Sequence, residues 1–593
     1  MESKPEKGAW VASLTETMPL TALDYTAPQN YMMKCFLFPF SGTLDHEREA
    51  AVDYLRDRLA RVLSDLPFLA GQIIHTGKDE LPRLVYPGNG TPFNFELFPD
   101  EVFDHQVLDR SKFPWAFDEL SAAGVPARSM IKDLFWLLPK TAPRPGDSCH
   151  PVTLRASFID GGLILGFSLH HGIMDGGATA EFFKLFAAAD DLLETSGGIA
   201  SLKQRKNNFI AFATGAAQTS PVNPLTMPGY DFASPSSPTP SPPGLSPSPS
   251  PNSGVSGGAV AKILTVSAAT ATALHDAVLA HLRTTTQDLT AFASTTDTLC
   301  ALVWVHVTRA RLRRCNGTSS GLGVRPEDIT HFATAVDLRA RGRLAPSVLA
   351  ASTPSPPHLA MNGGGSETEE SEEGTKGSSG GGYLGNLFLR TQAGTTVGEL
   401  VGLKDRDGNG DDDDGHHDDS SSLQRRATTA QIAEAAWRIR RAVAQIDEDP
   451  ATVEAHIAIA ARATHAKMVA AADADADDGA GAETGWHMAW PDVDAAIRRA
   501  IARHHAGLDA SVGVNLGADV EFAIPGVSGG MKVKAAWVRR AYVPNEGAMS
   551  LLPRRGGTKG GENWEIWLAL REEDMKILEE PSELGGWLSR PPA

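Results

Sequence analysis

Hydrophobic residues recur along this chain with two different periods. In the segment LRDRLARVLSDLPFLAG (55–71), apolar residues three and four positions apart form one face of a helix, which Pro67 ends. The Gly161-Gly162 pair separates two apolar runs of strand length, which predicts a β-hairpin. Further strands are predicted at 72–75, 82–87, 261–267 and 331–341, and further helices at 177–193, 270–285 and 296–314. The order of these elements predicts a mixed α/β protein.

Segments of biased composition divide the chain. Pro and Ser dominate from about residue 218 to 258, and such a composition favours extended solvated backbone over a packed core. A chain of 593 residues is also too long for one hydrophobic core. We therefore predict an N-terminal domain over 1–220, a linker over 221–258 and a C-terminal domain over 259–593. Low-complexity insertions are predicted in the C-terminal domain at about 352–382, 404–422 and 471–484.

The formal net charge of −18 is concentrated in the insertions. Residues 404–419 hold eight Asp against two basic residues, 367–376 hold five Glu against one Lys, and 473–483 hold five acidic residues and no basic one. These three segments account for −15 of the total, so the remaining chain is close to neutral. Runs of like charge usually solvate loops. The acidity therefore does not indicate a functional surface, and a nucleic-acid partner is not expected.

Cysteine usage and the N-terminus indicate the compartment. The four cysteines, Cys35, Cys149, Cys300 and Cys315, include no C-x-x-C pair, which is typical of a reducing environment. The first sixteen residues lack the apolar run of a signal peptide, and no stretch approaches the roughly 20 apolar residues of a membrane span. We expect a cytoplasmic protein without a membrane partner.

One segment, HHGIMDG (170–176), is a candidate active-site motif. Its H-x-x-x-D pattern alone is weak evidence, because about one chance match is expected in a chain this long with 18 histidines. Two other matches occur, His75–Asp79 and His505–Asp509, the second with His504 in front of it. His75 falls in a polar turn, and His505 follows the amphipathic stretch 493–503, so both are interpreted as structural or solvent-facing.

The histidine of this segment that fits the pattern, His171, has a different local context. It follows an apolar strand and precedes a Gly-flanked turn and a helix. We expect it at a strand end, a position where catalytic side chains are often presented. From this context alone, a histidine with a purely structural role would be equally expected.

The segment HHGIMDG, preceded by FIDGGLILGFSL, resembles the active-site segment of the BAHD acyltransferases, in particular their fungal trichothecene acetyltransferase-like branch. Other segments resemble motifs of the same family in the same order. They are LTALDYTAPQNY (20–31), LARVLSDLPFLAGQI (59–73), STTDTLCALVW (294–304), AVDLRAR (335–341) and YLGN (383–386). The resemblance thus extends over most of the chain outside the insertions.

The resemblance implies an α/β fold of two chloramphenicol-acetyltransferase-like domains, each with a mixed β-sheet and flanking helices, and an active site in a channel between them. It implies that an acyl group, acetyl in the first instance, passes from acyl-CoA to a hydroxyl or amine of a small molecule. His171 would act as general base, without a covalent acyl-enzyme. The expected setting is fungal secondary metabolism, and the expected form is a monomer without a permanently bound cofactor.

The same resemblance assigns supporting roles. Asp175 is expected to point away from the site into a salt bridge with Arg339, which would fix the loop that carries His171. Gly176 is expected to allow a tight turn, although it could simply start the helix. His170 is expected to support the site.

The chain departs from the family near its C-terminus. Plant members carry D-F-G-W-G, whereas the comparable region here, 517–526, keeps an aspartate, Asp519, and lacks the Gly-Trp-Gly. Asp519 is expected to take the structural role of that motif's aspartate. The phosphates of the coenzyme need cations. The candidates are Lys532, Lys534, Arg539 and Arg540.

Other chemistries find less support. Residues 405–416 begin like an EF-hand loop, but His416 stands where a bidentate Glu is required. No His/Cys cluster has metal-ligand spacing, so no metal is expected. Two alternatives stay open. One is a condensation-domain-like synthase that takes acyl groups from carrier proteins, because HHxxxDG also marks those domains, and the other is a catalytically inactive binding protein of the same fold.

Overall fold

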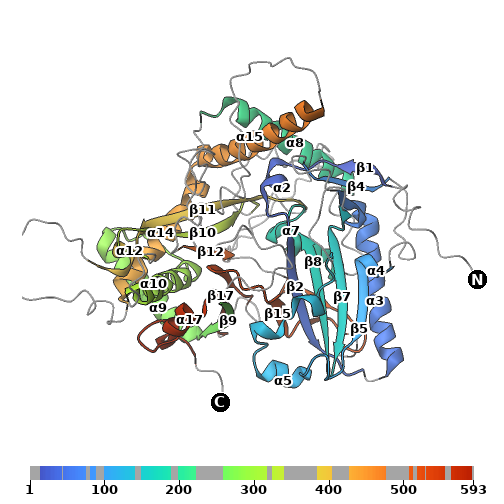
Figure 1. Ribbon diagram of the computed structural model, residues 1–593, viewed down its shortest axis with the longest axis horizontal. Helices are drawn as coiled ribbons and strands as arrows, with labels where there is room; N and C mark the ends of the chain where they lie inside the picture. Colours follow the sequence, from blue (N-terminus) through green and yellow to red (C-terminus); the bar gives the residue numbers. More distant parts are fainter. Residues whose placement is uncertain are drawn as a thin grey trace, which may run out of the picture.

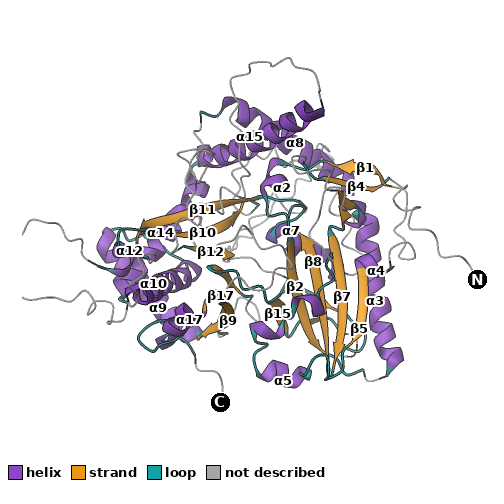
Figure 2. Ribbon diagram, in the orientation of Figure 1, coloured by secondary structure: helices purple, strands orange, loops and turns teal. Residues whose placement is uncertain are grey.

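The structure is a computed structural model that describes residues 14–42, 44–74, 81–88, 99–139, 148–188, 198–221, 258–316, 324–339, 383–403, 427–475, 507–511, 517–527, 529, 531–553 and 562–589. The predicted linker and insertions lie largely outside these residues. The described residues form two lobes, each built from a β-sheet with helices (Figures 1 and 2).

A five-stranded mixed sheet is the centre of the N-terminal lobe. Its strands, in spatial order, are β15 (Trp537–Arg540), β2 (Tyr31–Pro39), β8 (Gly162–His170), β7 (Val152–Ile159) and β5 (Phe103–Val107). The predicted hairpin is β7–β8, and Gly161 in its turn has φ +70°, a left-handed conformation that glycine adopts without a Cβ clash. Every residue of β8 is buried. The strand that leads to His171 therefore lies inside the sheet.

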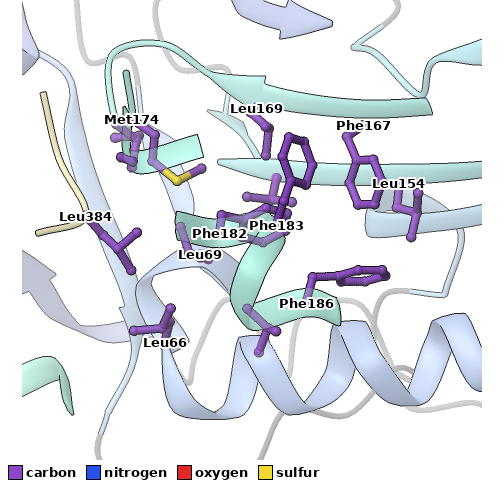
Figure 3. Packing of buried hydrophobic residues seen from close by; sticks show 14 of the residues in the cluster. Leu66, Leu69, Leu154, Phe167, Leu169, Met174, Phe182, Phe183, Phe186 and Leu384 are labelled. Carbon is purple, nitrogen blue, oxygen red and sulfur yellow. The ribbon is translucent and has the colours of Figure 1, made fainter. Parts of the chain in front are cut away.

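Two helices cover one face of this sheet. α3 (Asp45–Asp65) buries the apolar stripe predicted from its period, including Leu55 and Leu59. α7 (Gly176–Ala187) buries three phenylalanines, of which Phe183 and Phe186 lie 5.1 and 5.2 Å from the ring of Phe167 on β8 (Figure 3). Such edge-to-face contacts add to the stabilisation from burial. The helix that starts directly after the candidate motif is thus anchored in the main core.

Smaller elements complete the N-terminal lobe. A four-stranded sheet contains β1 (Leu14–Met18), β4 (Arg83–Pro87), β3 (Gln72–Ile74) and β6 (Ser148–Cys149). The short helices are α2 (Ala22–Thr26), η1 (Pro67–Ala70), α4 (Pro99–Val102), α5 (Phe117–Ala122), η2 (Ala127–Ser129) and α6 (Lys132–Phe135), and the long one is α8 (Gly198–Thr219). The strands predicted at 72–75 and 82–87 correspond to β3 and β4.

The C-terminal lobe has a six-stranded mixed sheet. Its strands, in spatial order, are β11 (Phe388–Thr396), β10 (Ile329–Asp337), β12 (Leu508–Ser511), β16 (Ala548–Leu551), β17 (Trp564–Arg571) and β9 (Ala259–Val266). Its helices are α9 (Ala268–Thr286), α10 (Thr295–Asn316), α12 (Val397–Val401), α14 (Thr429–Glu448), α15 (Pro450–Asp475), α17 (Glu572–Leu578) and η6 (Leu584–Gly586). A two-stranded hairpin of β13 (Glu521–Phe522) and β14 (Val533–Lys534) packs instead on the core of the N-terminal lobe, where the ring of Phe522 lies 5.3 Å from that of Phe36.

The two faces of this sheet differ. Met549 and Leu551 of β16 pack with the helices α9, α10 and α14 in one apolar cluster. Ser550, between them, points the other way, because successive strand residues alternate faces, and it contacts Arg540 of β15. The second face of the C-terminal sheet therefore meets the N-terminal lobe.

The lobes are not divided cleanly along the sequence. β9 starts at residue 259, the first residue of the predicted C-terminal domain, but β15, also from the C-terminal half, joins the N-terminal sheet beside β2. α8 of the first half also packs against α15 of the second half (Figure 1). A division of the sequence at 220 and 259 therefore separates the two halves of the chain, but it does not separate the two lobes.

Candidate active site

His171 directly follows the last residue of β8 and is held by its main chain. Its N–H donates to the carbonyl oxygen of Asn30 at 2.8 Å, and its own carbonyl oxygen accepts from Nδ2 of Asn386 at 2.9 Å. Asn30 precedes β2 of the N-terminal lobe, and Asn386 precedes β11 of the C-terminal lobe. The ring of His171 lies 5.4 Å from the ring of Phe388, centroid to centroid. His171 is therefore positioned where the two lobes meet.

The electrostatic surroundings keep the imidazole of His171 neutral. Burial is the largest influence and lowers its pKa below the ordinary 6.5, and the positive charge of Arg390 acts in the same direction. The backbone carbonyl of His171, Asp175 and Asn386 raise the pKa, but less than burial lowers it. A neutral imidazole at pH 7 is able to accept a proton.

Asp175 is the N-terminal cap of α7 and points away from His171. Its Oδ1 accepts from the backbone N–H of Ala178 at 2.8 Å. Its Oδ2 accepts from Nη1 of Arg339 at 2.9 Å and from the backbone N–H of Leu387 at 2.7 Å. Asp175 and Arg339 are both buried, so the salt bridge expected from the sequence is present and joins the two lobes.

Arg339 is tied to the C-terminal lobe by its other donors. Nη2 donates to the carbonyl oxygen of Gly385 at 2.6 Å, and Nη1 also contacts Asp337 at 3.1 Å. Gly177, in the first turn of α7, packs directly against this pair. A Cβ atom on Gly177 would lie 2.6 Å from Oδ2 of Asp337 and 2.7 Å from Nη1 of Arg339. The small residue that the network needs is thus Gly177, whereas Gly176 begins the helix.

A second buried network was not predicted from the sequence. Asp24, which also belongs to the capping box of α2, accepts from Nζ of Lys206 at 2.7 Å, and both side chains are buried. Its Oδ1 accepts from the backbone N–H and Nδ2 of Asn386, each at 3.0 Å. Since Asn386 also holds the carbonyl of His171, this ion pair positions the loop behind the candidate base. Asp24 and Asn386 lie in the segments 20–31 and 383–386, so the family motifs pointed to the right stretches without pointing to the pairing.

His170 faces the opposite side of its strand. It is buried, its N–H donates to the carbonyl oxygen of Pro151, and its ring meets the ring of Tyr31 edge to face at 5.2 Å. Its place in the core agrees with a supporting role. The doubled histidine therefore consists of one core residue and one residue at the lobe interface.

The candidate cations for the coenzyme have different surroundings. Lys532 and Lys534 are exposed near the β13–β14 hairpin, and Lys534 contacts Asp519 at 3.4 Å, with both side chains well exposed. Arg539 is buried, and its guanidinium donates to both carboxylate oxygens of Glu565 and to backbone carbonyls. Its donors bond within the protein, which favours a structural role for Arg539 over the predicted contact to phosphate.

Asp519 and Arg540 also differ from their expected environments. Asp519 is exposed and contacts Lys534, so a buried structural aspartate is not found at this position. Arg540 points toward the C-terminal sheet, where Nη1 donates to Oγ of Ser550 at 2.6 Å and the guanidinium lies 4.2 Å from the ring of Trp567. Arg540 therefore lies between the lobes and not on the outer surface.

Part of another H-x-x-x-D match, His505–Asp509, lies at the same interface. His504, His505 and His75 lie outside the described residues, but Asp509 belongs to β12. Both of its carboxylate oxygens accept from Nη2 of Arg390 at 2.6 Å. Arg390 and Phe388 are two residues apart on β11 and share a face. Asp509 thus orients Arg390, which lies beside His171.

A cavity of about 1220 Å³ lies elsewhere, between the α5–η2 region and strands β9 and β17. Its lining contains carboxylates and Lys262 but no histidine. The chemistry of the described residues therefore favours the His171 region over this cavity. Within the described ranges, no three His, Cys, Asp or Glu residues gather closely enough to hold a metal ion, and no helix has both the length and the apolar character needed to span a membrane.

Known proteins resemble this chain in sequence and structure. Residues 31–189 match the family model of the trichothecene 3-O-acetyltransferase-like N-terminal domain. The chain is 23% identical over 319 residues to the O-acyltransferase pigD of Monascus ruber, covering 51% of this chain and 61% of that protein. It is 27% identical over 172 residues to the trichothecene 8-O-acetyltransferase of Fusarium sporotrichioides, covering 28% and 34%. Matches to the curated relatives thus span about a third to three fifths of their length.

Solved structures extend the likeness to the whole chain. The TRI101 protein of F. sporotrichioides, solved with coenzyme A and T-2, superposes with a TM-score of 0.59 at 18% identity, covering 95% of this chain and 97% of that one. The apo TRI101 protein of F. graminearum gives a TM-score of 0.58 at 17% identity. The fold is therefore the α/β fold of the TRI101 proteins, which this chain forms as two lobes. The chain is thus similar to fungal trichothecene acetyltransferase-like proteins, over residues 31–189 in sequence and over most of its length in fold.

Proposed function

We propose that this protein transfers an acyl group from acyl-CoA to a hydroxyl or amine of a small molecule, with His171 as general base. The observation that carries the proposal is the position of a neutral imidazole at the lobe interface, with its main chain held from both lobes. The family relatives named as O-acyltransferases and acetyltransferases support the reaction class. The TRI101 structures with coenzyme A support a thioester donor.

The described groups suffice for a direct transfer. The acceptor's hydroxyl or amine loses its proton to His171 as its oxygen or nitrogen attacks the thioester carbonyl, and the thiolate of coenzyme A leaves and receives a proton. The neutral ring of His171 carries one N–H and one basic nitrogen, and the basic nitrogen takes the proton. No nucleophilic side chain is needed, so no covalent acyl-enzyme forms. General-base catalysis of this kind is typically worth ~10²–10⁴ in rate.

Asp175 contributes by position. Its carboxylate accepts three hydrogen bonds, from the backbone of Ala178 in α7, from Arg339 and from the backbone of Leu387. It is therefore unavailable as a second base. We assign Asp175 and Arg339 as positioning residues that fix the turn between His171 and α7. We further propose a monomer that acts in the cytoplasm on a secondary metabolite, with acetyl-CoA as the donor to try first.

The direct test uses purified full-length protein, acetyl-CoA and a panel of alcohols and amines. Release of free thiol that depends on an acceptor, with an acetylated product detected by mass spectrometry, is the expected result. Intact-protein mass spectrometry after incubation with acetyl-CoA alone should show unmodified protein. Failure of the protein to bind either acetyl-CoA or coenzyme A in calorimetry would contradict the proposal.

A further inference from the structure

Two cations face each other at the edge of the N-terminal sheet. Lys34 on β2 and Arg540 on β15 are direct antiparallel partners. Side chains in such a pair lie on one face with Cβ atoms about 4.5–5.5 Å apart, and like charges placed in this way are destabilising. Among the described residues, no carboxylate comes within 4.0 Å of either cation. The pair therefore lacks the anion that buried cations normally have.

Burial and neutral neighbours disfavour the charged forms of both side chains. Burial lowers the pKa of Lys34 to about 7, with the charge of Arg540 as the second cause. Burial also lowers the pKa of Arg540 to about 10, against the effect of Asp509. Ser550 and Trp567, which contact Arg540 from the C-terminal sheet, are neutral and buried. The negative charge of Asp509 acts on Arg540, but both of its oxygens accept hydrogen bonds from Arg390.

The cation pair lies on the same interface as His171. The main chain of His171 is bonded to Asn30, and Lys34 comes four residues after Asn30 in the chain that forms β2. At about 3.3 Å per residue, this separation along the strand is about 13 Å. Across the interface, Phe388 contacts His171, Arg390 binds Asp509, and Asp509 acts on Arg540. These contacts connect His171 to the pair along the interface.

We infer that Lys34 and Arg540 bind a carboxylate group carried by one of the two substrates, about 13 Å along the strand from the level of His171. The inference rests on the proposed function and adds the class of substrate. A carboxylate accepts hydrogen bonds from both cations, and such charge-assisted bonds are roughly twice as strong as neutral ones. The phosphates of coenzyme A fit less well, because the whole pantetheine arm, which is longer than this separation, lies between them and the thioester.

The carboxylate could belong to the acceptor or to a dicarboxylic acyl donor, and calorimetry on the full chain distinguishes the two. In the acceptor arm, the probes are 10-hydroxydecanoate, whose hydroxyl and carboxylate are about as far apart as the level of His171 and the pair, and its methyl ester. In the donor arm, the probes are succinyl-CoA and acetyl-CoA. The variants are Lys34→Met and Arg540→Gln, and the control is Lys184→Met, which removes an exposed cation of α7 that pairs with Glu181. Thermal melting checks that each variant is folded.

The wild type should bind the charged member of at least one probe pair about 10-fold more tightly than the neutral member. Lys34→Met and Arg540→Gln should abolish that preference, and Lys184→Met should retain it. The inference is overturned if neither arm shows a preference for the carboxylate in the wild type, a comparison that needs no variant. It is also overturned if Lys34→Met weakens coenzyme A, acetyl-CoA and succinyl-CoA equally, because the pair would then hold the coenzyme's phosphates. Loss of all coenzyme binding in the wild type would instead contradict the proposed function, and the comparison of acid with ester would still decide the inference.

Discussion

At the scale of single residues, the account depends on the protonation of His171. Its pKa is lowered mainly by burial, so the neutral base persists below pH 6.5. The value of kcat/KM should stay constant as pH falls to 6.5 and should drop tenfold per pH unit only below the lowered pKa. A pH–rate profile with an acidic limb centred at or above 6.5 would contradict the assignment.

The Asp175–Arg339 pair makes a second prediction at this scale. Asp175→Asn removes the buried charge partner of Arg339 and leaves it only Asp337, whose side chain is 40% exposed, so we expect a loss of up to about 3–5 kcal/mol of unfolding free energy. Urea denaturation measures this loss. Arg110→Gln is the matched control, since Arg110 binds Glu119 and Asp160 at the surface and its loss should leave the unfolding free energy nearly unchanged. Equal losses of unfolding free energy in Asp175→Asn and Arg110→Gln would show that the buried pair does not stabilise the fold.

Sequence reasoning succeeded for residues whose roles are local. The stripe of α3, the β7–β8 hairpin and the exit of His171 from a buried strand follow from period and turn chemistry. Adjacent residues in a strand were harder to separate. Arg539 and Arg540 look alike in the sequence, but they point to opposite faces, so one is tied to Glu565 and the other reaches the lobe interface.

At the scale of elements, the start of α7 is the sensitive point. Gly177→Ala should destabilise the protein by about 1–3 kcal/mol, because its new Cβ would displace Asp337 and Arg339 from contact distances of 2.6 and 2.7 Å. Gly215 in α8 is the control, since a Cβ there has no neighbour within 4 Å. Gly215→Ala should stabilise by about 0.5–1 kcal/mol, the ordinary gain in a helix interior. Thermal or urea unfolding of both variants checks the pair, and equal shifts in the same direction would contradict the account.

The long-range contacts between elements could not be predicted from one sequence. Asp24 and Asn386 are 362 residues apart, and no local pattern states that a helix cap in one lobe accepts hydrogen bonds from a loop in the other. The place of β15 beside β2 is a similar case, because a short strand carries too little pattern to choose its sheet. The family resemblance indicated the Asp175–Arg339 contact, which residue spacing would not have found.

At the scale of the molecule, the connection between the halves is expected to be dispensable. α8 ends at Thr219 and β9 begins at Ala259, and the Pro/Ser-rich segment between them has the composition of a solvated linker. Excision of residues 225–255 should leave a folded, active protein, because loop-closure entropy changes slowly with length. Soluble expression and thiol release of the shortened protein test this. An insoluble product would show that the segment is part of the folded structure.

The central claim is that His171 is the base, and the sequence supplies its own control. His171→Ala and His505→Ala remove the same side chain from two H-x-x-x-D motifs that each follow another histidine. With the acceptor found in the panel, thiol release from acetyl-CoA should fall at least ~10²-fold in His171→Ala, while the unfolding free energy stays within about 1 kcal/mol of wild type. His505→Ala should stay within a few-fold of the wild-type rate. Near-normal activity of a well-folded His171→Ala protein, or loss of activity in His505→Ala alone, would contradict the account.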